Sequence, residues 1–142
     1  PLIYALLFGM PGTPALYYGS EWGISGEKAP CSDAGLRPAL EKPEWNALTS
    51  WIARLAAARR GSPALREGSY RNVLLTNLQL IFERRTETER VLVAVNADSQ
   101  PYTAHFDAGC GLAWDLISGQ QHDFGGGSQL PPYSAFFWKM ER

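Results

Sequence analysis

The sequence lacks several features that would assign it quickly to a functional class. It has no excess of either charge, with a formal net charge of -1 over 142 residues. Nucleic acids and membrane surfaces are usually bound through a basic excess, so neither partner is expected. No apolar stretch approaches the roughly 20 residues of a membrane-spanning helix. The apolar run 2–10 also lacks the basic flank and small-residue cleavage site of a signal peptide.

Cysteine and metal-ligand patterns are equally sparse. Cys31 and Cys110 are the only cysteines, which makes neither a disulfide framework nor a metal site, and we expect reduced, unpaired thiols. His105 and His122 have no cysteine or aspartate at ligand spacing. The aspartates of the second half are scattered, as in turns rather than in a calcium cage. The sequence therefore predicts no metal site and no cofactor.

The first half predicts helix, strand, long loop and helix. An apolar run over 2–8 ends at Gly9 and Pro11-Gly12, as the end of a helix does. Residues 15–18 are apolar at every position, which suits a parallel strand covered by helices on both faces. A polar loop is expected over 19–42, and loops longer than about 12–15 residues are usually functional or disordered. A helix is expected from Pro43 to Gly61, with Trp45 and Trp51 as packing groups.

The second half predicts short antiparallel strands. The best strands, 78–83 and 91–96, form a hairpin around the charged turn 85–89. Further strands are expected at 102–106, 113–117, 122–124 and 135–140, with turn residues about every ten positions. We therefore expect a mostly β chain: a Greek-key antiparallel β-sandwich over 65–142. The helices and strand of 1–64 have the order found at the end of a (β/α)8 barrel.

The stretch "GMPGTPALYYGSEWG" resembles the segment around the eighth strand of the α-amylase superfamily of glycoside hydrolases. Five residues match the family pattern: Gly12, Pro14, Tyr17, Gly19 and Glu21. "SPALREGSY", "VLVAVNADS" and "DLISG" resemble, in order, the exit from the last barrel helix and parts of the family's C-terminal sandwich. The resemblance implies a barrel remnant over 1–64, comprising the end of helix 7, strand 8, a long loop and helix 8, followed by domain C over 65–142.

Within the superfamily, "SDAGLRPAL" resembles an element of cyclomaltodextrinase- and neopullulanase-like members. The resemblance implies that Asp33 and Arg37 bind sugar. Their chemistry suits this role, because the aspartate carboxylate accepts from sugar hydroxyls and the arginine guanidinium is a planar fork of donors. The alternative is a surface ion pair that orders the loop. This chain lacks the tryptophan that often follows in that element, which leaves the subfamily open.

The corner Gly19-Ser20-Glu21-Trp22 carries the remaining candidates. We expect Gly19 and Glu21 to be structural, with Glu21 anchoring the corner through hydrogen bonds to loop backbone. Trp22 either stacks on a sugar or covers local core. Trp114 and Trp138 are interpreted as core residues of the sandwich, with a surface carbohydrate platform as the alternative.

The family's reaction needs two carboxylates about 5 Å apart and a third that stabilises the transition state. The resemblance implies that all three lie upstream of Pro1, so this chain alone is expected to be inactive. The resulting hypothesis is the C-terminal part of a retaining hydrolase of α-glucans, whose calcium binding is left open. The alternatives are an independent carbohydrate-binding sandwich and a structural or oligomerising domain. The apolar segment 15–18 would lack barrel neighbours, so self-association is expected. Localisation is left open, with the cytoplasm favoured.

Overall fold

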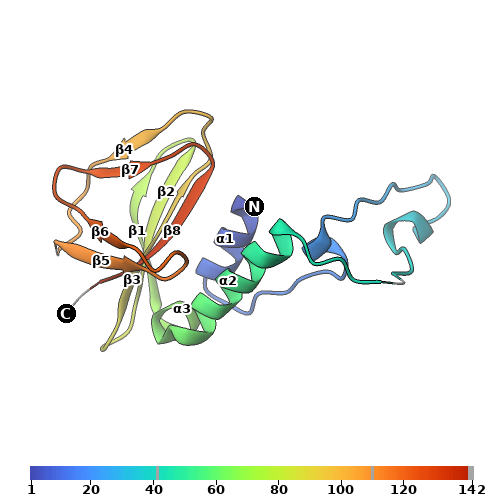
Figure 1. The fold of residues 1–142 in the computed structure, drawn as a ribbon, viewed down its shortest axis with the longest axis horizontal. Coiled ribbons are helices and arrows are strands. Elements are labelled where there is room, and N and C mark those ends of the chain that lie inside the picture. The colour runs from blue at the N-terminus through green and yellow to red at the C-terminus, as the bar shows by residue number, and fades with distance from the viewer. Residues whose placement is uncertain (41, 110, 141–142) are drawn as a thin grey trace.

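The structure is a computed structural model that describes residues 1–40, 42–109 and 111–140. The helical half comprises α1 (Leu2–Gly9), the 3-10 turns η1 (Ser20–Trp22) and η2 (Ala34–Leu36), α2 (Ala47–Gly61) and α3 (Pro63–Glu67). The strands are β1 (Ser69–Leu75), β2 (Gln79–Arg85), β3 (Arg90–Asn96), β4 (Tyr102–Ala104), β5 (Leu112–Asp115), β6 (Gln121–Asp123), β7 (Ser128–Leu130) and β8 (Ser134–Met140). Figure 1 shows the strands at one end, the helices in the middle and the loop before α2 at the other end.

The strands form the expected antiparallel sandwich. The larger sheet has the order β1-β2-β3-β8-β5-β6, and the smaller sheet pairs β4 with β7. The predicted hairpin is confirmed as β2 and β3, which pair from Gln79↔Asn96 to Arg85↔Arg90. The strands β1 and β7 and the short helix α3 were not predicted separately.

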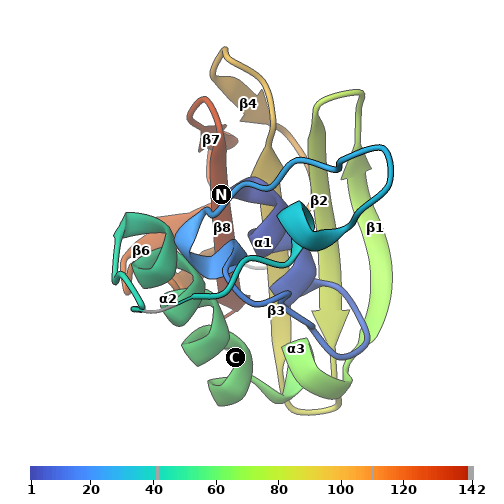
Figure 2. The same ribbon diagram turned by 90° about the vertical axis from the view of Figure 1, so that its right-hand side faces the viewer.

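The larger sheet is covered on both faces, because successive side chains of a strand point to opposite sides. On one face, Val91 and Val93 join Phe82 and Phe137 in a core with Phe8 and Leu55 of the helices. On the other face, Leu92 and Ala94 join Trp138 in a core with Ala104 and Leu130 of the smaller sheet. Figure 2 shows α1 and α2 lying against the larger sheet.

The first of these cores contains side chains from both sides of residue 64. It therefore joins the two predicted domains through shared packing. The division into 1–64 and 65–142 stays a prediction.

The predicted strand at 15–18 is wrong. These residues belong to no strand, Tyr18 lies in a turn, and Leu16, Tyr17 and Tyr18 are 39%, 57% and 48% exposed. A parallel strand needs donors and acceptors from neighbouring strands, and the part of the chain that the structure describes supplies none beside this segment.

The helix expected from Pro43 begins later, at Ala47. Asn46 is its N-cap: the Asn46 side chain accepts from Thr49 N at 3.0 Å, and Thr49 Oγ1 accepts from Asn46 N. This capping box provides acceptors for backbone N–H groups at the start of the helix, and a start at Pro43 would not provide them. Trp45 therefore precedes the helix and is 73% exposed, so its predicted packing role is wrong. Trp51 packs against the helix-side core as expected.

Two buried polar residues explain the motifs of the sandwich. In "VNADS", Asn96 Nδ2 donates to three backbone oxygens, those of Gln100, Leu130 and Pro131. In "DLISG", Asp115 Oδ1 accepts from Phe137 N at 2.8 Å, while Oδ2 accepts from the Ser118 backbone and hydroxyl. Both motifs therefore fix loops to strands.

Cys31 is exposed and forms no disulfide with any described residue, whereas Cys110 lies outside the described residues. None of the helices among the described residues is long and apolar enough to cross a membrane.

Candidate functional site

The corner Gly19–Trp22 turns on two glycines in left-handed conformation. Gly19 has φ +85° and Gly23 has φ +74°, on either side of the single turn η1. A Cβ atom on Gly19 would lie 3.2 Å from Leu40 Cδ1, so a larger residue meets both strain and crowding. This geometry accounts for glycine at position 19.

Three successive backbone oxygens of this corner are held by helical side chains. Tyr4 Oη donates to Ser20 O at 3.0 Å, Thr49 Oγ1 to Glu21 O at 2.9 Å, and Asn46 Nδ2 to Trp22 O at 3.0 Å. Thr49 and Asn46 form the capping box of α2, so the same residues start the helix and fix the corner. The corner is thereby attached to both α1 and α2.

The Glu21 carboxylate has a different environment from the one expected. Its Oε2 atom is buried and accepts no hydrogen bond among the described residues. The hydrogen bonds expected from loop backbone to Glu21 are therefore absent at this oxygen, whereas three backbone oxygens of the corner accept from side chains of the helical half. A buried carboxylate oxygen that accepts no hydrogen bond is costly, so Glu21 does not stabilise the corner through this atom.

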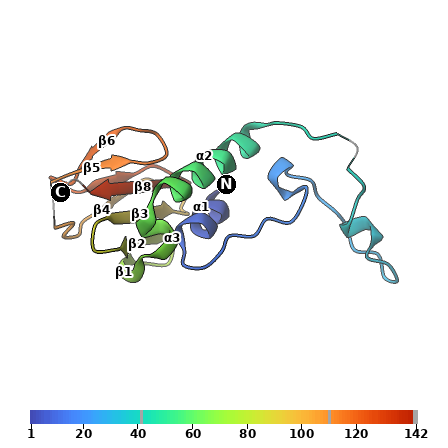
Figure 3. The same ribbon diagram turned by 90° about the horizontal axis from the view of Figure 1, so that it is seen from below.

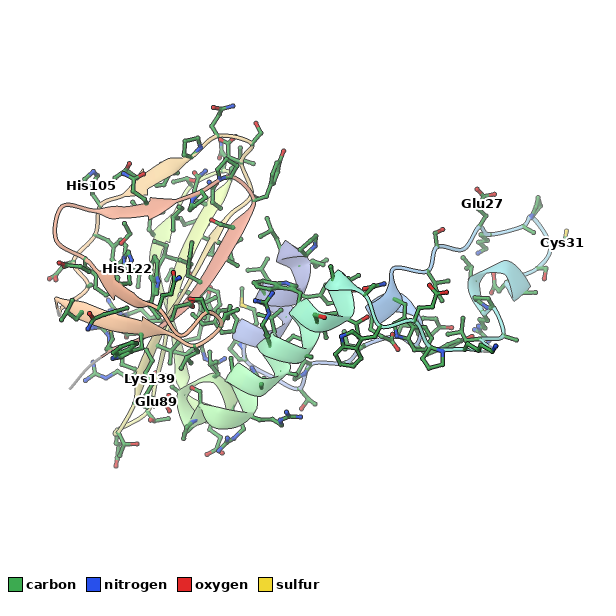
Figure 4. The ribbon with its side chains drawn as sticks, viewed as in Figure 1. Glu27, Cys31, Glu89, His105, His122 and Lys139 are labelled. Atoms are coloured by element: carbon green, nitrogen blue, oxygen red, sulfur yellow. The ribbon has the colours of Figure 1, made fainter. Side chains whose placement is uncertain are left out.

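The loop beyond the corner carries Asp33 and Arg37. Both residues are exposed, and the Asp33 carboxylate lies 3.7 Å from Lys28 Nζ rather than beside Arg37. Figure 3 shows this loop projecting away from the helices and the sandwich. In Figure 4, Glu27 and Cys31 label its tip. The sugar-binding roles of Asp33 and Arg37 stay predictions, and so does that of Trp22, which is half-buried in η1.

Two tyrosines, Tyr17 and Tyr18, lie beside the corner in the segment that was expected to be a buried strand. The rings of Tyr17 and Tyr18 lie 4.8 Å apart at an interplanar angle of 40°, and both are about half exposed. The pKa of Tyr18 lies above its usual value, first because of local desolvation and second because of the neighbouring Tyr17 hydroxyl. The positive charge of Arg37 lowers the same pKa. The signal in the sequence was the pair of hydroxyls in an otherwise apolar run.

Two buried arginines donate hydrogen bonds to the backbone of residues 8–12, which lead to the corner. Arg59 of α2 donates to Phe8 O at 2.8 Å and Met10 O at 3.0 Å, and also to Gly12 O. Arg84 of β2 donates to Gly9 O at 2.7 Å and to Gly68 O at 2.9 Å. Burial lowers the pKa of both guanidinium groups. These contacts supply donors to the carbonyl oxygens that the end of α1 leaves without helical partners.

The corner and its loop present side chains that are suited to contact with a polyol. Exposed aromatic rings, an arginine and carboxylates lie along the corner and loop, and such groups stack on and hydrogen-bond to polyols. Among the described residues, no group of three His, Cys, Asp or Glu side chains could hold a metal ion.

Comparison with known proteins gives the context of this arrangement. No family model matches the chain. The chain is 30% identical over 119 residues to a cyclomaltodextrin glucanotransferase of Bacillus sp. strain 38-2, covering 82% of this chain and 15% of that protein. It is 32% identical over 127 residues to the α-amylase MalA of Haloarcula japonica, covering 80% of this chain and 17% of that protein.

Solved structures extend the likeness to almost the whole chain. An α-amylase from Geobacillus thermoleovorans has a TM-score of 0.86 at 20% identity, over 99% of this chain and 32% of that chain. Ttha1563 from Thermus thermophilus has a TM-score of 0.78 at 34% identity, over 97% of this chain and 30% of that chain.

This chain belongs to the α-amylase superfamily.

The chain spans 15–17% of the length of the curated relatives named above. Its mostly β fold matches the C-terminal domain of α-amylase-family structures, and the aligned part also includes the helices and the loop. Those two curated relatives are a glucanotransferase and an α-amylase. A closer relation to cyclomaltodextrinases and neopullulanases therefore stays a prediction.

Proposed function

We propose that this chain is the C-terminal part of a retaining glycoside hydrolase that acts on α-glucans such as starch, maltooligosaccharides or cyclodextrins. One observation carries the proposal: the likeness to α-amylase structures covers the corner, the loop and the helices as well as the sandwich. A relative that shared only a sugar-binding sandwich would align over residues 69–140 alone.

The chain has two roles in this proposal. The sandwich supports the barrel through the helix-side core, in which Phe8 and Leu55 pack against Phe82 and Val93. The corner and its loop border the substrate cleft, with Asp33, Arg37 and Trp22 as sugar contacts. The fastening of the corner to Tyr4, Asn46 and Thr49 fits this positioning role.

The catalytic carboxylates of the reaction belong to another part of the enzyme in this proposal. Retaining hydrolysis needs two carboxyl groups about 5 Å apart. Glu21 is the acid at the corner, and a single carboxylate cannot act as both nucleophile and general acid. The isolated chain is therefore inactive and needs no cofactor of its own.

An independent carbohydrate-binding sandwich is the competing function. Such a module would leave its sheet face intact when the helices are removed. Here the sheet residues Val91, Val93 and Phe137 are fully buried within the core that α1 and α2 complete. This shared core favours the first function.

The experiment compares the 142-residue chain with a longer protein in which a barrel precedes it. Reducing-end release from soluble starch and from maltoheptaose is expected for the longer protein and absent for the chain alone. In the longer protein, D33A and R37A should raise KM by a larger factor than they lower kcat. E27A changes a residue of the same loop and serves as the control. Turnover by the pure chain would refute the assignment of catalysis to another part.

A further inference from the structure

A second surface, on the sandwich and far from the corner, has the chemistry of a carbohydrate-binding site. It is a concave region of about 560 Å³ at the end of the larger sheet where the β2–β3 turn meets β5 and β8. Trp114 and Lys139 line it from the sheet, and Arg85, Glu89 and Arg90 line it from the turn. Its volume lies within the range of about 300–1,000 Å³ typical of small-molecule sites.

The strand register explains why Trp114 is exposed there. One row of residues crosses the helix-side face of the sheet in the order Arg84, Val91, Lys139, Trp114 and Gln121. The helices cover the first part of this row, where Arg84 and Val91 are 1% and 0% exposed. They do not reach the second part, so Trp114 is 47% exposed and Lys139 is 45% exposed. The predicted core role of Trp114 is therefore wrong, whereas that of Trp138 is confirmed at 1% exposure.

The charged groups around Trp114 are mostly compensated within the protein. Lys139 Nζ lies 3.4 Å from Glu89 Oε1, and Figure 4 shows the two side chains together at the edge of the sandwich. Arg90 is paired with the buried carboxylate of Glu83 and also donates to Ala108 O. A surface of this kind presents donors and acceptors without a strong net charge, which favours a neutral polyol over an anion.

Glu89 contributes a further polar feature. Its side chain is 6% exposed, and its Oε1 atom accepts no hydrogen bond among the described residues. Its Oε2 atom accepts from Ala64 N at 3.4 Å, so the carboxylate also connects the turn to α3. Glu89 thereby holds Lys139 beside Trp114 from a fixed position.

We propose that this surface binds an oligosaccharide, with the Trp114 indole as the stacking platform and Lys139 and Gln121 as hydrogen-bonding groups. An aromatic face flanked by polar side chains matches the alternating apolar faces and hydroxyl rims of sugar rings. The choice of an α-glucan as the ligand rests on the proposed function. The surface lies on the sandwich, whereas the corner lies beyond the helices (Figure 1), so it is a separate site.

The test follows the indole N–H signals of the 142-residue chain by NMR during titration with maltoheptaose. W114F identifies the Trp114 signal and retains an aromatic ring, and W114A removes the platform. W45A is the matched control, because Trp45 is more exposed than Trp114 and lies before α2. We expect a saturable shift of the Trp114 signal in the parent chain. Calorimetric titration with maltoheptaose should show about tenfold weaker binding by W114A, with binding by W45A unchanged.

Three results would overturn the proposal. A Trp114 signal that does not move with maltoheptaose or with cellohexaose overturns the site and leaves the proposed function standing. Movement with cellohexaose alone overturns the α-glucan ligand and counts against the proposed function too. Movement with sodium sulfate alone identifies an anion site instead. Far-UV circular dichroism of W114A verifies that the variant is folded.

Discussion

Arg59 offers the sharpest test of how the corner is positioned. The guanidinium group is 7% exposed and donates to backbone oxygens at the end of α1 and just beyond it, those of Phe8, Met10 and Gly12. Replacement by methionine retains much of the aliphatic packing and removes all three donations. The perturbation therefore isolates the hydrogen bonds from the side-chain volume.

The magnitude follows from the balance between two opposing contributions. A hydrogen bond to a charged group contributes about 1.5–3 kcal/mol, and the loss leaves backbone oxygens without their donors. Removing a buried guanidinium also removes its desolvation penalty, which is several kcal/mol. Burial lowers the pKa of Arg59, in agreement with that penalty. We expect a net loss of about 2–4 kcal/mol, which is large for a single substitution.

The assay combines urea unfolding with hydrogen exchange of residues 10–24. R60M is the matched control, since Arg60 is the adjacent exposed residue of the same helix. The R59M variant should unfold at lower urea and exchange faster at 10–24, while R60M stays within about 0.5 kcal/mol of the parent chain. Equal stability and equal exchange in R59M and R60M would refute the fastening role of Arg59.

Three further predictions concern the corner, the sandwich and the exposed face. G19A should lower the free energy of unfolding by about 1–2 kcal/mol, because residue 19 has φ +85°. G61A has open space around its Cβ position and should be neutral or stabilising. Equal effects of the two substitutions in chemical unfolding would contradict backbone strain at residue 19. Burial lowers the pKa of His122, with Asp123 and Asp115 opposing, so the neutral ring that stacks on Trp138 is favoured on folding. The contribution of His122 to the free energy of unfolding should therefore be complete above the unfolded pKa of about 6.5 and be lost as pH decreases through the folded pKa. H122Q should remove this pH dependence of stability. An unchanged pH dependence in H122Q would show that His122 is not its source. Sedimentation should show self-association through exposed apolar residues of α1 and 15–18, and a monodisperse monomer with slow exchange at 15–18 would contradict it.

The sandwich could be predicted from sequence because its signals are local. The continuous apolar run of β3 and the charged turn after β2 place the hairpin directly. The motif residues Asn96 and Asp115 each accept a hydrogen bond from backbone two or three positions later, which gives the motifs recognisable spacing. Short strands such as β7, with three residues, carry too little alternation to be recognised.

The site was less predictable because its geometry depends on distant partners. Segment 15–18 has the composition of a buried parallel strand, but pairing depends on neighbouring strands and not on composition. Asn46 was overlooked as a cap because Pro43 offered an earlier start signal, although Asn46 also holds the corner. The exposure of Trp114 depends on which part of the sheet the helices cover, which no pattern within β5 encodes.

The central claim is that this chain forms the C-terminal part of an enzyme acting on α-glucans. The most direct test replaces the matching 127 residues of the α-amylase MalA, at 32% identity, with this chain and measures starch hydrolysis. We predict a folded chimera that hydrolyses starch, with activity reduced by R59M and not by R60M. A chimera that folds cooperatively yet releases no reducing ends would contradict the claim.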